Sequence, residues 1–355
     1  MKAHVCVDGR LIRQTGIGTF LRSTLAEISQ SAAYELTILC HENDQEQLKV
    51  FSSRLVVMQS AIYTVKEQVE YRKKIPQCDL FWSPHFNVPL WPIRAKKKVS
   101  VVCDVYHLAH FSSLTLFQKM YAKLLYNAAF YTSDVVVTIS EFSKKEILKF
   151  SSLKPKKLVV ISPSFDFVPS QQKAEKKNHL LYVGNLKPHK NLVRLVQAYA
   201  KLRPQELLVI VGKRDGLHTP DSLLFREVEK DPFLKRNVRF AGYVEEEELK
   251  AHYSTASLFL FPSTYEGYGY PPLEAMASGC PVIAAKAASI PEVCQDAAEY
   301  IDPYSVNSIA EGIKTLLQDK VRKEELVRKG HELIEKKKKQ KKQIVDLIDA
   351  CCNSP

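Results

Sequence analysis

One stretch constrains the possible folds of this chain more than any other, and it runs from Ser263 to Gly279 as STYEGYGYPPLEAMASG. The apolar run Leu258–Phe261 before it predicts a buried strand. The two prolines suit the first turn of a helix, and Gly279 suits its end. A glycine-rich turn leading into a helix N-terminus is suited to bind a phosphate or sugar hydroxyls, because backbone N–H groups and the helix dipole point there. Glu266 then lies beside such a ligand, and Glu274 is placed to accept hydrogen bonds from a ribose.

A capped surface helix with two incidental acids is the alternative, and the flanking glycines, prolines and buried strand favour the ligand site. The stretch resembles the paired-glutamate signature of the retaining glycosyltransferases of family four, which share the GT-B fold. The resemblance implies that Glu266 positions the hydroxyls of the transferred sugar. It also implies that Gly267, Tyr268, Gly269 and Glu274 bind the donor.

Strand-like and helix-like segments alternate along the chain, which indicates parallel sheets with helices on both faces. The predicted strands are 3–7, 35–39, 55–58, 79–82, 99–103, 134–139, 158–161, 179–183, 207–211, 238–240, 258–261 and 281–284. The predicted helices are 19–29, 116–131, 141–150, 192–202, 246–254 and 273–278, followed by a charged helical end from residue 320. A polar linker at 163–178 separates the two halves.

The prediction is therefore an α/β protein of two doubly wound, Rossmann-like domains that face each other across a cleft, the GT-B architecture. Residues 1–172 form the acceptor-side domain and residues 173–330 the nucleotide-sugar-binding domain. The resemblance implies that the C-terminal helix and basic tail, residues 331–355, pack back on the first domain.

Composition limits the class of protein. A length of 355 residues predicts two domains, and a hydrophobic content of 45% supports real cores. No window is apolar and long enough to span a bilayer, and the N-terminus predicts a first strand instead of a signal peptide. The 8 cysteines are scattered, which favours a reduced, cytoplasmic protein over a disulfide framework or a zinc site.

The net charge of +12 lies mostly in residues 1–172, where Lys and Arg exceed Asp and Glu by 8. Such an excess favours an anionic partner, and ordinary solubility charge is the alternative. No nucleic-acid module is present, so we expect no nucleic-acid partner. The runs Arg72–Lys74 and Lys96–Lys98 predict reversible docking on an anionic membrane, peripheral to its inner face. The later run Lys336–Lys342 is expected to be a solvated helix face.

A second loop, Gly184–Lys190, follows a predicted strand and opens a helix whose N-cap is expected to be Asn191. Gly184 lets the backbone approach a ligand, and the Lys190 ammonium suits neutralisation of a departing diphosphate. The loop resembles the family's diphosphate-binding loop, in which an arginine commonly stands where this chain has Asn185. Either Arg194 or Lys213 is a candidate for the missing charge.

Two sites in the first half complete the resemblance. The glycine pair at 16–18 resembles the family's glycine loop near donor phosphate and acceptor, and Gly16 is the residue carried over. The family commonly has His-Asp where this chain has Cys103 and Asp104. His107 and His110 are candidates to contact the sugar instead, and a structural role is the alternative.

The sequence thus predicts a retaining glycosyltransferase that moves a hexose from a nucleotide-sugar to a glycan or lipid-linked acceptor. The loop patterns look most like mannosyl-type enzymes of surface-polysaccharide assembly, which favours GDP-mannose and leaves UDP-hexoses open. The resemblance implies no cofactor and no metal. Two alternatives remain: a nucleotide-sugar epimerase with the GT-B fold, and a non-catalytic basic binding or scaffold protein.

Overall fold

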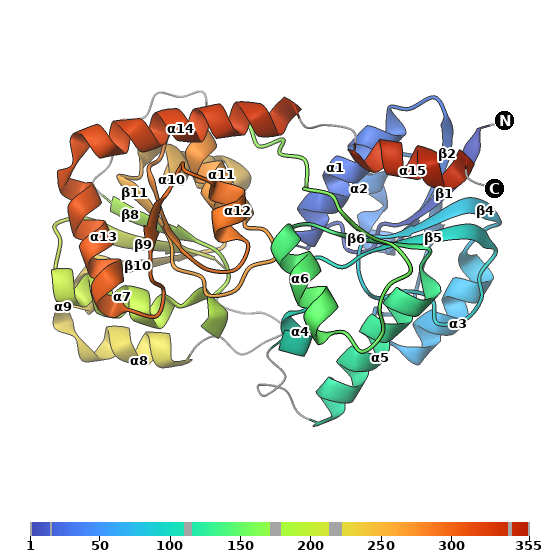
Figure 1. The fold of residues 1–355 in the computed structure, drawn as a ribbon, viewed down its shortest axis with the longest axis horizontal. Helices are drawn as coiled ribbons and strands as arrows, with labels where there is room; N and C mark the ends of the chain where they lie inside the picture. Colours follow the sequence, from blue (N-terminus) through green and yellow to red (C-terminus); the bar gives the residue numbers. More distant parts are fainter. Residues whose placement is uncertain are drawn as a thin grey trace. The chain divides into compact units, whose positions relative to one another are not determined.

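A computed structural model describes residues 2–14, 16–109, 116–170, 179–212, 222–339 and 343–353. It divides into two compact units, each with a parallel sheet covered by helices (Figure 1). The first unit holds residues 1–165 and 340–355, and the second holds residues 166–339. The predicted alternation of strands and helices around parallel sheets is therefore confirmed in both halves.

The first unit has a seven-stranded sheet in the order β3-β2-β1-β4-β5-β6-β7. Its strands are β1 (Ala3–Asp8), β2 (Tyr34–Cys40), β3 (Arg54–Val57), β4 (Cys78–Ser83), β5 (Ala95–Val101), β6 (Val135–Thr138) and β7 (Leu158–Val160). Its helices are α1 (Ile17–Ser29), α2 (Gln45–Leu48), α3 (Val65–Lys74), α4 (Tyr106–Ala109), α5 (Leu116–Thr132), α6 (Glu141–Phe150) and α15 (Gln343–Asn353).

The C-terminal helix α15 belongs to the first unit. It contacts α1 and β4, and the Tyr34 hydroxyl donates a hydrogen bond to Asp349 Oδ1 over 2.5 Å. The apolar residues Ile344, Leu347 and Ile348 are buried there. These contacts account for a helix so far along the chain lying beside the first strands (Figure 1).

The second unit has a six-stranded sheet in the order β10-β9-β8-β11-β12-β13. Its strands are β8 (His179–Val183), β9 (Leu207–Val211), β10 (Val238–Gly242), β11 (Leu258–Phe261), β12 (Val282–Ala285) and β13 (Glu299–Ile301). Its helices are α7 (Leu192–Leu202), α8 (Ser222–Lys230), α9 (Pro232–Asn237), α10 (Glu246–Thr255), α11 (Tyr270–Ala277), α12 (Ile290–Cys294), α13 (Val306–Gln318) and α14 (Lys320–Lys339).

Burial explains why most strands were predictable and some were not. The strands β8 and β11 are buried along nearly their whole length and match the predicted ranges residue for residue. The prediction of a strand at 99–103 was wrong at both ends, because β5 begins with the lysine-rich Ala95–Lys98 and ends at Val101. The short β13 was missed, since its three residues carry little periodic signal. In the described part of the chain, no helix combines the length and apolarity needed to cross a bilayer.

The carboxyl ends of the adjacent strands β8 and β9 are packed too closely for side chains at Gly184 and Gly212. The amide of Gly184, after β8, donates to the Val211 carbonyl over 2.9 Å, and the amide of Gly212 donates to the Gly242 carbonyl over 2.8 Å. A Cβ on Gly212 would lie 1.8 Å from the Gly184 carbonyl oxygen. This backbone contact fixes the start of the loop that carries Lys190.

We predict that Gly212→Ala destabilises the second unit by about 3 kcal/mol, because the Gly184 carbonyl has to move to admit the methyl group. For a unit of this size the melting temperature falls by roughly 9 °C. Gly242→Ala is the matched control, since its Cβ would meet nothing within 4 Å and only the positive φ of 73° opposes it. Thermal unfolding that is affected equally in both variants would contradict the close contact.

Candidate functional site

The loop that follows β8 is tied directly to the loop that follows β11. The Thr264 amide donates to the His189 carbonyl over 2.8 Å, and the Thr264 hydroxyl donates to the same oxygen over 3.1 Å. Because β8 and β11 are parallel neighbours, their carboxyl ends meet at one edge of the sheet. The two loops predicted from separate motifs therefore form one structure.

Asn191 fastens this structure to a third loop. Its side-chain amide donates to the carbonyls of Pro262, over 3.1 Å, and Pro303, over 2.6 Å. Its backbone is left-handed, with a φ of 62°, and its side chain makes no capping bond to α7. Asn191 thus occupies the predicted N-cap position of α7, but its side-chain amide joins loops instead of capping the helix. Asparagine tolerates this backbone region better than most residues.

Lys190 and Glu266 meet as an ion pair at the centre of these loops. Lys190 Nζ lies 2.6 Å from Glu266 Oε1, and each side chain is only 12% exposed. The ammonium also lies 5.9 Å from the centroid of the Phe261 ring. A charged pair so shielded from water interacts more strongly than a surface pair, but each partner depends on the other. An ammonium has three N–H donors, so Lys190 can hold Glu266 and an anionic group together.

Glu266 begins the glycine-rich turn that leads into α11. Gly269 precedes the helix with a φ of 105°, and prolines occupy its first turn, as predicted. The buried Ser289 hydroxyl lies 2.9 Å from the carbonyl oxygens of both Glu266 and Tyr268. The Tyr268 ring is 5% exposed, so the side chain of this predicted donor-binding residue faces the protein. The turn therefore directs the positive end of the α11 dipole towards the region of Glu266.

Glu274 lies on α11 and receives a hydrogen bond from the Tyr253 hydroxyl over 2.7 Å. Burial raises the pKa of Glu274, and the Tyr253 hydroxyl partly offsets that rise. One carboxylate oxygen is thus engaged within the protein. The Glu274 residue as a whole is partly buried.

The residues proposed to supply a second positive charge have different surroundings. Arg194 Nη1 donates to Asn191 Oδ1 over 3.0 Å, and its guanidinium carbon lies 5.9 Å from the Tyr304 ring centroid. Arg194 therefore supports the loop junction. Asn185, at the usual arginine position, has a buried Oδ1 with no hydrogen-bond partner among the described residues. Lys213 lies outside the described residues.

The predicted residues of the first unit have local structural roles. Asp104 Oδ1 accepts a hydrogen bond from the Tyr106 amide over 3.0 Å and so supports the start of α4, which carries His107. The His107 ring packs edge-on against Tyr106 at 5.8 Å. Gly16 precedes α1 with a φ of 72°, and a Cβ there would meet nothing within 4 Å. His110 lies outside the described residues.

A buried charge network next to β1 escaped prediction, although its sequence was in view. Arg10 pairs with Asp8 and with Glu67, each over 2.7 Å, and the Tyr71 hydroxyl donates to Asp8 over 2.7 Å. Burial favours a higher pKa for Asp8, but the Arg10 guanidinium outweighs it and lowers that pKa. Arg10 Nη1 is buried without a partner among the described residues. The sequence feature that could have predicted this network is Arg10, which stands two residues after Asp8 at the end of a predicted strand.

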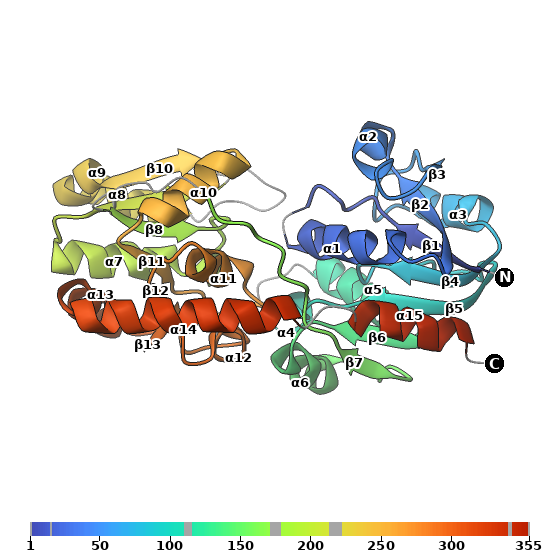
Figure 2. The ribbon, with the colours of Figure 1, turned by 90° about the horizontal axis from the view of Figure 1, so that it is seen from above.

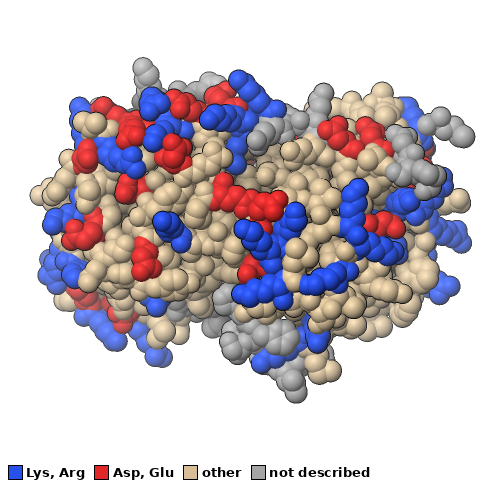
Figure 3. All heavy atoms as spheres, viewed as in Figure 1, with Lys and Arg blue, Asp and Glu red and all other residues tan. Residues whose placement is uncertain are grey.

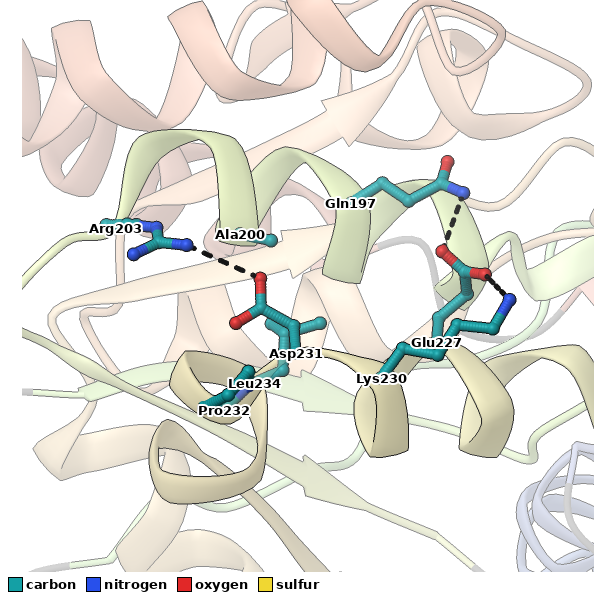
Figure 4. Close-up of a pocket in the computed structure, with 8 residues that line it drawn as sticks. All are labelled: Gln197, Ala200, Arg203, Glu227, Lys230, Asp231, Pro232 and Leu234. Carbon is teal, nitrogen blue, oxygen red and sulfur yellow. Dashed lines mark hydrogen bonds and ion pairs between the residues drawn. The ribbon is translucent and has the colours of Figure 1, made fainter.

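A surface hollow of about 420 Å³ lies elsewhere in the second unit, between α7, α8 and α9 (Figure 4). Its charged side chains are matched with one another: Arg203 Nη2 lies 3.7 Å from Asp231, and Glu227 accepts from both Gln197 and Lys230. None of the predicted site residues lines it. Within the described residues, no cluster of three or more His, Cys, Asp or Glu side chains has an arrangement suited to a metal ion.

Solved structures of known proteins share this fold. The sucrose-phosphate synthase of Thermosynechococcus elongatus matches 99% of this chain and 100% of its own, with a TM-score of 0.77 at 18% identity. HepE of Anabaena, solved with UDP-glucose, matches 98% of this chain and 100% of its own, with a TM-score of 0.77 at 17% identity. At this level of identity the likeness concerns the fold alone, and it confirms the predicted GT-B fold class.

Known sequences resemble part of this chain. Residues 164–340 match the family described as Glycosyl transferases group 1. The O-antigen chain mannosyltransferase B of Escherichia coli is 34% identical over 205 residues, which are 53% of this chain and 52% of that protein. The O-antigen chain mannosyltransferase RfbU of Salmonella typhimurium is 33% identical over 201 residues, 57% of this chain and 56% of that protein. The chain thus spans about half the length of these curated relatives.

We predict that Asn191→Gly destabilises the second unit by about 2 to 3 kcal/mol, because two buried carbonyls lose their donor. Glycine adopts the left-handed backbone freely, so the substitution isolates the hydrogen bonds. Arg203→Gly is the control, since Arg203 also has a positive φ, of 48°, but is exposed. Its stability should change by less than about 1 kcal/mol. Equal urea midpoints for the two variants would show that the junction contributes nothing.

Proposed function

We propose that this chain is a retaining glycosyltransferase that moves a hexose from a nucleotide-sugar to a glycan or lipid-linked acceptor. The observation that carries the proposal is the ion pair of Lys190 and Glu266, which the fold assembles from two loops at one sheet edge. The pair lies within the segment that matches the group 1 glycosyltransferases. A shielded cation and carboxylate beside a helix N-terminus provide one group for a diphosphate and one for sugar hydroxyls.

In this proposal each group has a distinct task. The Lys190 ammonium and the α11 dipole stabilise the negative charge that develops on the departing diphosphate. Glu266 accepts hydrogen bonds from the sugar hydroxyls, and its position is fixed by Lys190. Glu274 binds the ribose with the oxygen that Tyr253 leaves unoccupied. Gly184 admits the donor close to the backbone, where a larger residue would meet the Tyr182 hydroxyl.

We propose retention through displacement on one face of the sugar, in which the leaving phosphate helps to deprotonate the incoming hydroxyl. The proposed scheme differs from that of retaining hydrolases, in which a second carboxylate about 5 Å from the first acts as the nucleophile. In this scheme Lys190 and the helix dipole supply the charge stabilisation that a metal ion supplies in other transferases. Metal independence remains part of the proposal.

GDP-mannose is the favoured donor, and mannose is the favoured sugar for transfer. The two sequence relatives named above are mannosyltransferases, and this supports the sugar. The structural neighbour HepE was solved with UDP-glucose, so UDP-hexoses remain the alternative donors. An epimerase of the same fold would convert the donor without an acceptor, and analysis of the products formed without acceptor distinguishes it.

Thermal shift and turnover together test the proposal. GDP or GDP-mannose at about a hundredfold over its dissociation constant should stabilise the protein by about 2.7 kcal/mol. We predict that Lys190→Ala lowers transfer about a hundredfold or more, because one charge facing the diphosphate is lost. Lys201→Ala removes an exposed charge at the end of α7 and should leave turnover unchanged.

Two results would count against this assignment. If neither GDP, UDP nor their sugars shifts the melting temperature at millimolar concentration, the glycosyltransferase proposal fails. If Lys190→Ala retains transfer within about threefold of wild type, another group neutralises the diphosphate.

We also propose a cytoplasmic protein whose first unit docks on an anionic membrane. The structure weakens the case for the run Lys96–Lys98, whereas Arg72, Lys73 and Lys74 are all exposed, as membrane docking requires. Lys96 is already paired with Asp79 over 2.7 Å, and burial lowers the pKa of Lys98. Exposed apolar residues lie instead on one face of α5, where Met120, Leu124 and Tyr131 are 66%, 55% and 72% exposed.

Basic residues accompany these apolar ones. Lys123 on α5 is exposed next to Leu124, and Lys145 and Lys149 on α6 are exposed near Leu148. Blue side chains gather over α6 on the face shown in Figure 3, whereas over α14 they alternate with red ones. Lysines interspersed with exposed leucines suit an anionic bilayer, which takes up both the charge and the apolar surface.

We predict that the protein sediments with vesicles containing phosphatidylglycerol but not with phosphatidylcholine alone, and that salt weakens this binding. Lys123→Glu with Leu124→Asp should weaken membrane binding at least tenfold. The variant loses one positive charge that attracts anionic lipid and one exposed leucine that would enter the bilayer. Lys96→Glu is the control that reverses one lysine charge without altering the apolar face of α5, and it should have a smaller effect. Equal loss in both variants would refute the α5 surface, and absence of binding would refute membrane docking.

A further inference from the structure

One lysine in the basic run at the end of α14 differs from its neighbours. Lys336, Lys338 and Lys339 are exposed, as predicted for a solvated face, but Lys337 is partly buried. Lys337 Nζ donates to the Tyr268 hydroxyl over 3.0 Å and lies 5.3 Å from the Tyr268 ring centroid. The prediction of a uniformly solvated run was therefore wrong at Lys337.

The surroundings of Lys337 oppose its charge. Burial lowers the pKa of Lys337, and Cys294 and Glu292 of α12 only partly counteract that effect. An ammonium with a flexible stem ordinarily stays in water, as the neighbouring lysines do. Ordering this side chain against Tyr268 costs hydration and rotamer freedom, which distinguishes Lys337 from the exposed lysines beside it.

The Tyr268 ring belongs to the turn that carries Glu266. The backbone of this turn is held by the Ser289 hydroxyl at the carbonyls of Glu266 and Tyr268. Its one large buried side chain is held by Lys337. Ser289 thus holds the backbone of the turn, and Lys337 holds the Tyr268 side chain. Tyr268 is two residues from Glu266, whose carboxylate meets Lys190.

The helix that carries Lys337 is itself firmly placed against α11. Gly330 of α14 packs so closely on Met276 that a Cβ would lie 3.1 Å from the Met276 Cβ. A Cβ on Gly279, just past α11, would lie 3.9 Å from Val327 of α14. The helices α11 and α14 are in contact, and α14 crosses close to α11 in both Figure 1 and Figure 2. Lys337 therefore reaches the turn from a rigid support that already contacts the following helix.

We propose that Lys337 is a positioning residue: through Tyr268 it holds the Glu266–Gly269 turn in the geometry that presents Glu266 to the donor sugar. Its effect on turnover rests on the proposed function, whereas its effect on the turn does not. Small misplacements of a positioning group can cost about a hundredfold in rate. Loss of one of two supports should cost less than this, about tenfold.

Lys337→Met tests the proposal, because it keeps the apolar stem and removes only the ammonium. Lys339→Met is the matched control, with the same charge loss on the same helix at an exposed position. Amides of residues 264–269 in the ligand-free protein should exchange with deuterium about tenfold faster in Lys337→Met and at the wild-type rate in Lys339→Met. The turnover number should fall about tenfold while the KM for the donor changes less than threefold.

Tyr268→Phe provides a second, milder route to the same contact. It should reproduce the faster exchange of the turn, and the Tyr268→Phe, Lys337→Met double variant should add nothing further. Independent, additive effects would overturn the proposal, as would exchange in Lys337→Met equal to that in Lys339→Met. If the wild type turns over no nucleotide-sugar, the proposed function fails, and the exchange measurements still decide the role of Lys337.

Discussion

The amide of Asn191 is the interaction on which the arrangement of the second unit's site depends. It joins the loops after β8, β11 and β13 through the carbonyls of Pro262 and Pro303. Buried carbonyls need donors, and here one side chain serves two of them. Lys190 precedes Asn191 directly, so the lysine is placed by the same junction that places the loop of Glu266. Arg194 in turn holds the amide oxygen of Asn191.

The loops joined by Asn191 hold the ion pair of Lys190 and Glu266 in a fixed position. Separating either Lys190 or Glu266 from its partner would leave a shielded charge alone, which typically costs several kcal/mol. The two charges therefore balance each other before any ligand arrives. In the proposed reaction a diphosphate would add negative charge near Lys190. One ammonium can then serve both the phosphate and Glu266 only if both anions fit around it. This requirement makes the position of the turn critical.

The sequence allowed most of the second unit's framework to be predicted, because its strands are apolar runs between clear turns. The motifs placed Lys190 and Glu266 each in a loop that follows a predicted strand, and both strands are present. The direct pairing of Lys190 with Glu266 could not be predicted, since it depends on how two loops 76 residues apart are fastened together. Asn191 was assigned to capping because an asparagine before a helix usually caps it. Only its left-handed backbone, with a φ of 62°, turns the side chain towards other loops.

Side-chain contacts are even harder to predict from sequence when several identical residues follow one another. Four consecutive lysines end α14, and the sequence gives each the same environment. A helix presents successive residues about 100° apart, so a run of this length covers the whole circumference and one member must face inward. Lys337 is that member, because it follows the buried Leu333 and Ile334 by four and three residues and so lies on the same helix face. Gly330, two turns before Lys337, packs against Met276, so the contact with Tyr268 extends the face of α14 that meets α11.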